Sequence, residues 1–65
     1  MIHLQMIYFN HLDEHGNVIE RTHRPMDEKF TSREELDVLR LKLWNEFMAD
    51  GKDVVIRFQY LTMEE

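Results

Sequence analysis

The segment between residues 33 and 50 carries more apolar side chains than one small sheet can cover. Four of them recur at spacings of three and four residues, which predicts one stripe along a helix. This first stripe consists of Leu36, Leu39, Leu43 and Phe47. A second stripe repeats the spacing roughly 100–120° further around the helix, at about 100° per residue. It consists of Leu41, Trp44 and Met48. Because a chain of 65 residues has room to bury one stripe, we predict that the second is a surface for a partner or a second copy.

Trp44 is the strongest sign of such a surface. Trp and Met are over-represented at protein interfaces, and Asp37 and Arg40 lie near the second stripe, where they would form its polar rim. The alternative is that Trp44 belongs to the core, because aromatic residues at helical spacing are often buried. The sequence leaves both interpretations open.

The composition argues against several classes of protein. Sixty-five residues make at most one domain, and the absence of cysteine excludes disulfides and thiolate-rich metal sites. The net charge is −5 and the bases form no stripe, so we expect no direct binding to nucleic acid or to an anionic membrane. No apolar run approaches the roughly 18 residues of a membrane span. The N-terminal segment lacks the features of a signal peptide, so we expect a cytoplasmic protein.

Alternating and periodic apolar residues predict four elements. These are strands at 2–10, 18–23 and 53–63 and a helix at 33–50. The second strand is short and polar, as expected of an edge, and Pro25 is expected to end it because proline has no N–H to donate. Ser32 is the better N-cap candidate, with Glu35 completing a capping box, and Thr31 with Glu34 is the competing register. Gly51 is expected to end the helix.

These elements predict an α+β fold with a three-stranded antiparallel sheet in the order 2-1-3 and one helix on one face. Placing the polar second strand in the centre fits worse. The third strand is then an open edge, which natural proteins usually cover or pair. Regular alternation predicts a second apolar patch on the sheet face away from the helix. Its members are Ile7, Phe9, Val55 and Leu61.

The chain contains no recognisable catalytic or cofactor motif. His11 and His15 have the spacing of two metal ligands on a helix, but they lie in a segment that reads as a turn, so we expect no metal site. His3 and His23 are expected to face each other across the hairpin. Adjacent acidic pairs diverge on a strand or helix, which does not suit glycosidase-type chemistry. We therefore expect no enzyme activity, no cofactor and no bound metal.

Acidic residues far outnumber basic ones along much of the chain. Such an excess mostly confers solubility, although rows of carboxylates can also imitate the phosphates of DNA. In its hairpin–helix–strand order, acidic balance and size, the chain loosely resembles the phage inhibitors of uracil-DNA glycosylase and, more loosely, some anti-CRISPR proteins. That resemblance rests on layout and implies a DNA-mimic inhibitor of a DNA-handling enzyme. It transfers no functional residue.

These observations favour a non-catalytic protein-binding module, with a small acidic inhibitor or regulator of a larger protein as the leading version and a homodimer as the expected state. The alternatives are the DNA mimic and a structural subunit that only self-assembles. The residues expected to bind protein are apolar anchors and nearby carboxylates. They are Leu41, Trp44, Met48, Val55, Leu61, Asp37, Glu34 and Glu35.

Overall fold

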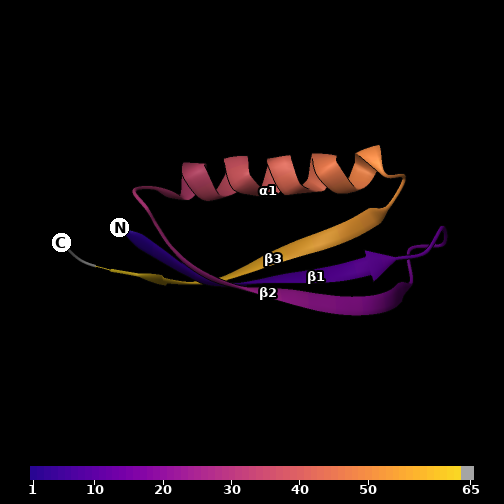
Figure 1. The fold of residues 1–65 in the computed structure, drawn as a ribbon, viewed down its shortest axis with the longest axis horizontal. Helices are drawn as coiled ribbons and strands as arrows, with labels where there is room; N and C mark the ends of the chain where they lie inside the picture. The colour runs from indigo at the N-terminus through magenta and orange to yellow at the C-terminus, as the bar shows by residue number, and fades with distance from the viewer. Residues whose placement is uncertain (64–65) are drawn as a thin grey trace.

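A computed structural model describes residues 1–63 of the chain. The elements follow the order β1 (Ile2–Leu12), β2 (Val18–Phe30), α1 (Arg33–Ala49) and β3 (Asp53–Thr62). The strands form one antiparallel sheet in the order β2-β1-β3, and α1 lies along one face of it (Figure 1). The predicted α+β fold, strand order and helix position are therefore confirmed.

An irregularity in β1 decides which side chains face the helix. Both pairings of β1 shift register between Leu4 and Met6. Against β3 the extra residue lies on β1, because Leu4 pairs with Tyr60 while Met6 pairs with Gln59. An extra residue of this kind is a β-bulge, and it reverses the alternation of side chains beyond it. Even-numbered residues face α1 before the bulge, and odd-numbered residues face α1 after it.

The bulge overturns one prediction from regular alternation. Ile7 and Phe9 were expected on the face away from the helix, but both are buried in the core under α1. Tyr8, expected to share a face with Ile2 and Leu4, is instead exposed on the opposite side. The expected second apolar patch thus loses two of its four members and keeps Val55 and Leu61.

The core is a single layer between α1 and the sheet. β1 and β3 provide most of the floor, and the first helical stripe provides the roof. Leu36 and Leu43 are buried, and Leu39 and Phe47 pack against them partly buried, which confirms the first stripe as the core face. The buried residues are Ile2, Leu4, Ile7, Phe9, Leu36, Leu43, Val54 and Ile56.

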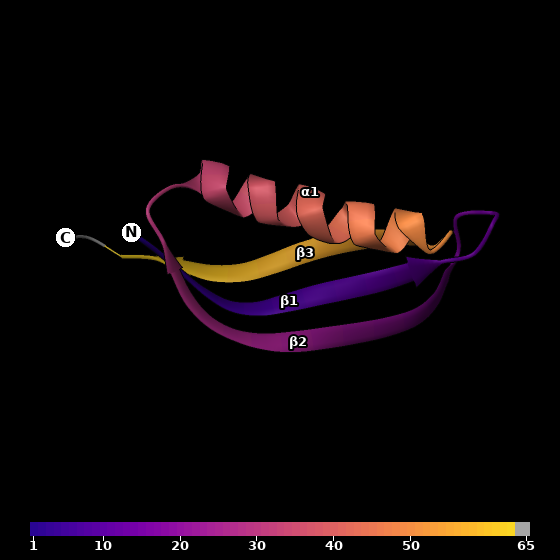
Figure 2. The same cartoon turned by 45° about the horizontal axis from the view of Figure 1, so that its top comes forward.

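The second strand is longer than predicted. It continues through Pro25 to Phe30 instead of ending near residue 23. Pro25 is tolerated because β2 is an edge strand and because Pro25 lies next to the register shift, opposite Met6. Figure 2 shows β2 as the strand furthest from α1, and nearly all of its side chains are exposed.

The ends of α1 follow the predicted boundaries with one difference. Ser32 is the N-cap residue, but its side chain makes no capping bond. Instead the Glu35 carboxylate accepts hydrogen bonds from the Thr31 N–H and from the Thr31 hydroxyl, each at 2.9 Å. At the other end, the N–H groups of Gly51 and Lys52 donate to the helix carbonyls two and three positions before the C-cap, in a Schellman motif. Gly51 has the expected positive φ of 71°.

The β1–β2 turn is closed by one carboxylate. Asp13 Oδ1 accepts hydrogen bonds from the N–H groups of His15 and Asn17, each at 2.9 Å. Gly16 supplies the positive φ of 83° that the turn requires. The hydrogen bond from the Asn17 backbone, together with those from His15 and Gly16, lowers the pKa of Asp13 and outweighs the opposing effect of desolvation.

We expect Leu43→Ala to lower the free energy of unfolding by about 2–5 kcal/mol, because it removes a buried side chain and leaves a cavity. Leu43 is 6% exposed, whereas Val38, on the opposite side of the same helix, is 69% exposed. The matched change Val38→Ala should therefore alter stability by no more than about 0.5 kcal/mol. Urea unfolding followed by circular dichroism measures both. Equal losses for the two variants would contradict this orientation of α1.

Candidate protein-binding groove between the helix and the edge strand

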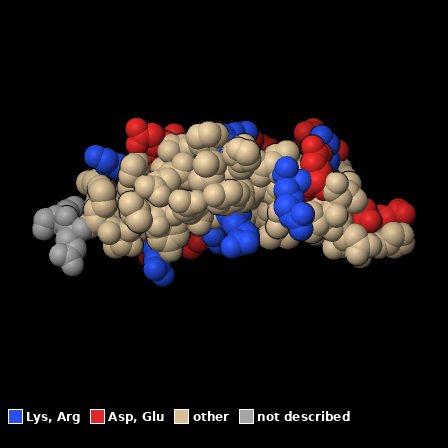
Figure 3. All heavy atoms as spheres, turned by 90° about the horizontal axis from the view of Figure 1, so that it is seen from below, with Lys and Arg blue, Asp and Glu red and all other residues tan. Residues whose placement is uncertain are grey.

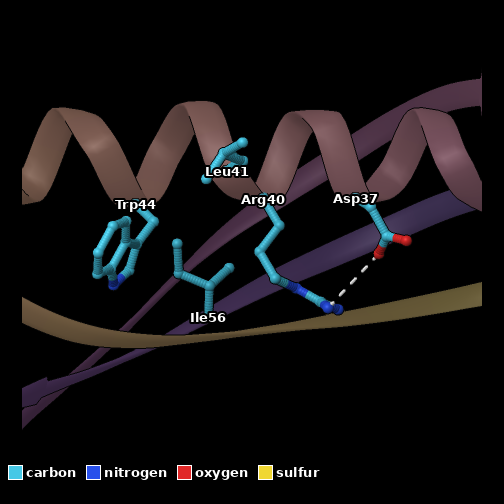
Figure 4. Close-up of a pocket in the computed structure, with 5 residues that line it drawn as sticks. All are labelled: Asp37, Arg40, Leu41, Trp44 and Ile56. Atoms are coloured by element: carbon cyan, nitrogen blue, oxygen red, sulfur yellow. Dashed lines mark ion pairs between the residues drawn. The ribbon is translucent and has the colours of Figure 1, made fainter.

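A groove runs between α1 and β3 along the open edge of the sheet. Its first section, the α1–β3 groove, is lined by Asp37, Arg40, Leu41, Trp44 and Ile56 and has a volume of about 360 Å³. Figure 4 shows Trp44 and Arg40 reaching from α1 towards β3, with Ile56 rising between them. The hollow is lined mainly by apolar atoms and is bounded by only two elements. It is therefore too open to enclose a small molecule in the usual way.

The groove continues towards the start of the helix. Asp37 and Arg40 also line the next section, together with Arg33, Leu36, Phe58 and Tyr60. The guanidinium carbon of Arg40 lies 5.0 Å from the centre of the Phe58 ring, and that of Arg33 lies 5.9 Å from the centre of the Tyr60 ring. Both distances fit cation–π contacts, which cover apolar rings while leaving the charge in water.

Arg40 is held by a second contact within the helix. Its Nη1 lies 3.7 Å from Asp37 Oδ1, one turn earlier. Both side chains are substantially exposed, so the pair adds little to stability. Its effect is to place one positive and one negative charge beside the apolar part of the groove. Asp37 and Arg40 thus lie where a polar rim was predicted.

The second helical stripe is exposed. Leu41 is 58%, Met48 45% and Trp44 40% exposed, so none of the three belongs to the buried core. The core interpretation of Trp44 is therefore wrong: its side chain lines the groove beside Ile56 and is otherwise in water. Met48 lies one turn beyond Trp44 and does not line the groove. Their role in binding remains a prediction.

The other predicted site residues lie in different places. Glu34 and Glu35 are exposed in the first turn of α1, where their charge suits the positive end of the helix dipole. Glu35 is engaged with Thr31 and is less available to a partner. Val55 and Leu61 are exposed on the sheet face away from the helix, so they border the β3 edge from the other side.

Sequence reasoning did not assign the floor of the groove. The predicted position of Val55 and Leu61 on the face away from the helix implies that the intervening even-numbered side chains face it. The structure places Ile56, Phe58 and Tyr60 on that helix-facing side. Phe58 and Tyr60 remain partly exposed because α1 does not cover β3 on the side of its open edge. The sequence did predict that β3 is an edge strand. That prediction could have indicated the exposed floor, because an edge strand has no neighbour on one side to cover its side chains.

The sheet face away from the helix has a different charge from the rest of the molecule. The strand registers place Arg21, Lys29 and Arg57 on this outer face, with Asp27 and Asp53 as its acids. Figure 3 views this face and shows a broad uncharged area with Lys and Arg groups on it and acidic groups mainly towards its margins. The chain as a whole carries −5, so the acidic excess lies away from this face.

The histidines do not converge. His11 lies on the helix-facing side of β1, accepts or donates a hydrogen bond at 2.8 Å to Thr22 and packs edge-on against Phe47. His15 lies in the turn, 3.4 Å from Glu14. The predicted opposition of His3 and His23 is wrong, because the bulge and the longer β2 place His3 opposite Lys29 and Tyr8 opposite His23. His3 instead contacts Asp27 at 2.6 Å.

Within residues 1–63, no group of three or more His, Asp or Glu side chains is arranged to hold a metal ion. Over the same residues, the helix is neither long nor apolar enough to cross a membrane. Comparisons of the chain with protein-family models, curated proteins and solved structures give no match.

We expect Glu35→Gln to reduce stability at neutral pH. The backbone and hydroxyl hydrogen bonds from Thr31 lower the pKa of Glu35, despite a small opposing effect of burial. A lowered pKa in the folded state means that the carboxylate stabilises the fold above the ordinary carboxyl pKa of about 4.3. This contribution is lost as the pH falls through the folded-state pKa. Chemical denaturation at a series of pH values should therefore show the variant and the wild type converging in acid.

Glu34→Gln is the matched control for this effect. It removes the same charge from the same helical turn, but it leaves the Thr31–Glu35 bonds in place. Both substitutions weaken the interaction with the helix dipole, so only the extra loss in Glu35→Gln reports the contact with Thr31. Indistinguishable pH profiles for the two variants would show that this contact does not stabilise the helix start.

Proposed function

We propose that this protein is a non-catalytic protein-binding module that acts through the α1–β3 groove and the free edge of β3. The observation that carries the proposal is the combination of exposed apolar side chains with an unpaired strand on the same side of the molecule. Trp44, Leu41 and Ile56 offer apolar contacts, and the edge offers backbone N–H and C=O groups. A bound strand uses both at once, as in other cases of strand addition to a sheet.

The charges around the groove support specificity more than affinity. Against three bases on α1, five acidic residues lie on the helix or at its C-cap, and net acidic charge steers a module towards a basic partner surface. They are Glu34, Glu35, Asp37, Glu46 and Asp50. A small acidic inhibitor or regulator of a larger protein fits these features best. Its apolar anchor would supply affinity, and its carboxylates would guide approach.

Mimicry of DNA has less support. A mimic presents a continuous row of free carboxylates, but Glu35 is bound to Thr31 and Asp37 is paired with Arg40. Positive side chains also occupy the outer sheet face. A subunit that only self-assembles would use the same groove and edge as an inhibitor, so it differs in its partner and not in its surface.

We expect Leu41→Ser and Trp44→Ala to weaken binding of a protein partner by at least about tenfold, as the loss of a central aromatic or apolar anchor commonly does. Binding is measured by immobilising the chain, recovering partner proteins from extracts of its own cells, and determining Kd for each purified partner. Self-association is measured separately by analytical ultracentrifugation. Leu41 is the cleaner position because it is 58% exposed and its replacement leaves the core intact.

Ile19→Ser is the control for a general loss of apolar surface. Ile19 is 67% exposed and lies near the β1–β2 turn, away from the groove. The control should bind like the wild type. The proposal fails if the wild type neither self-associates nor binds any protein. It also fails if Leu41→Ser and Trp44→Ala both bind as tightly as the wild type and the Ile19→Ser control.

A further inference from the structure

We infer that the occupant of the β3 edge is a second copy of this chain, paired antiparallel to β3 about a two-fold axis at Phe58. The inference rests on the proposed protein-binding function and makes a second copy, in place of a larger protein, the partner at this edge. The two three-stranded sheets would join into one six-stranded sheet with both helices on the same face. Such an interface is isologous, so each contact occurs twice.

The geometry of antiparallel pairing limits where the axis can pass. Residues directly opposite each other must point to the same face of the sheet and must have the same hydrogen-bonding orientation. In a symmetric pair these conditions hold only when the axis passes through a residue, because an axis between two residues would place a helix-facing side chain opposite an outward-facing one. Two such registers keep all but one of the ten residues of β3 paired, with the axis at Arg57 or at Phe58.

The side chains distinguish these two registers. An axis at Arg57 places that guanidinium directly opposite its own copy, and like charges in this position are destabilising. An axis at Phe58 removes the conflict, because Arg57 then lies opposite Gln59. On the outer face it also pairs Val55 with Leu61, both of which are exposed in the single chain. On the helix face it pairs Ile56 with Tyr60 and Phe58 with itself. Aromatic and β-branched cross-strand pairs of this kind stabilise sheets.

The position of α1 agrees with this pairing. The helix lies closer to β3 than to β2, and the groove between α1 and β3 opens on the side where the second copy would lie. With strands about 4.8 Å apart, a helix centred between β1 and β3 would lie roughly 10 Å from its symmetry mate, which is the spacing of packed helices. The second stripe, including Leu41 and Trp44, would then be covered.

The charges near the axis are also compatible with symmetry. Arg40 contacts Phe58, the residue on the axis, so the two Arg40 side chains approach each other in the dimer. Each copy also brings Asp37, which already lies 3.7 Å from Arg40. The axis therefore carries two positive and two negative charges, and each arginine retains a carboxylate.

The edge is also long enough to form a substantial interface. The molecule measures 44 × 19 × 15 Å, and the ten residues of β3 extend along its long dimension. At about 3.3 Å per residue the strand spans roughly 33 Å. A standard interface buries about 800 Å² from each partner, and pairing along β3 uses the longest side of the molecule to approach that area.

Single-cysteine variants test the register directly, because the natural chain contains no cysteine. Val55→Cys and Leu61→Cys are prepared separately, both at exposed positions, and are then mixed and allowed to exchange in a glutathione redox buffer. The Phe58 axis places Val55 opposite Leu61 of the second copy, within disulfide range. Intact mass spectrometry should show the mixed disulfide dimer. Neither variant alone should cross-link, because identical positions would lie roughly 20 Å apart, six residues along the strand.

A mixture of Val55→Cys with Gln59→Cys is the control, because those positions are opposite only when the axis passes through Arg57. It should cross-link more slowly than the first mixture. Faster cross-linking in this control, or in either variant alone, overturns the Phe58 register. A wild-type dimer in which neither mixture cross-links overturns edge pairing. A wild type that stays monomeric at high micromolar concentration overturns self-association altogether, while binding of another protein through the groove is decided separately by Leu41→Ser.

Discussion

The fold depends on the bulge in β1 between Leu4 and Met6. Without it, a regularly alternating β1 would direct Ile2 and Leu4 to one face and Ile7 and Phe9 to the other. Ile7 and Phe9 would then face away from α1, and Met6, Tyr8 and Leu12 would take their places under the helix. The extra residue brings all four under α1. The bulge therefore decides which apolar side chains of β1 form the core with α1.

The use of a single helix also explains why some apolar surface stays exposed. The first helical stripe covers the combined floor of β1 and β3, and residues 1–63 form no second helix to cover the rest. α1 lies towards β3, which places Leu41 and Trp44 above an edge strand instead of above the middle of the sheet. Exposed apolar side chains and unpaired backbone groups therefore meet along one side. Either feature alone is ordinary on a small protein, but together they form a surface that suits a strand from another chain.

The sequence predicted the features that depend on local patterns. The spacing from Leu36 to Phe47 gave the helix and its buried face, Gly51 marked its end, and the polar character of residues 18–23 identified β2 as an edge. The bulge could not be predicted in this way, because no glycine or other local signal marks Gln5. It is favoured by the burial of residues on both sides of it, which is a property of the whole core. The length of β2 was missed for a similar reason, since an edge strand and a nearby bulge tolerate Pro25.

Only part of the candidate site was predicted, because local patterns specify the helix but not how it packs on the sheet. Helical spacing identified the second stripe, but the floor of the groove at Phe58 depends on how α1 lies over β3, which periodicity does not specify. The distribution of charge on the surface also depends on the fold. Arg21, Lys29 and Arg57 are scattered in the sequence and meet only because the strand registers bring them to one face.

The two faces of the sheet can therefore act independently. A two-fold axis perpendicular to the sheet keeps both helices on one side and both outer faces on the other. Pairing along β3 would consume the groove and the open edge, whereas Arg21 lies on the outer face of β2, at the opposite edge of the sheet. The acidic helices and the more basic outer face would remain on opposite sides of a continuous sheet. A partner that meets the dimer would thus encounter two surfaces of different charge, each twice the size of the surface on one chain.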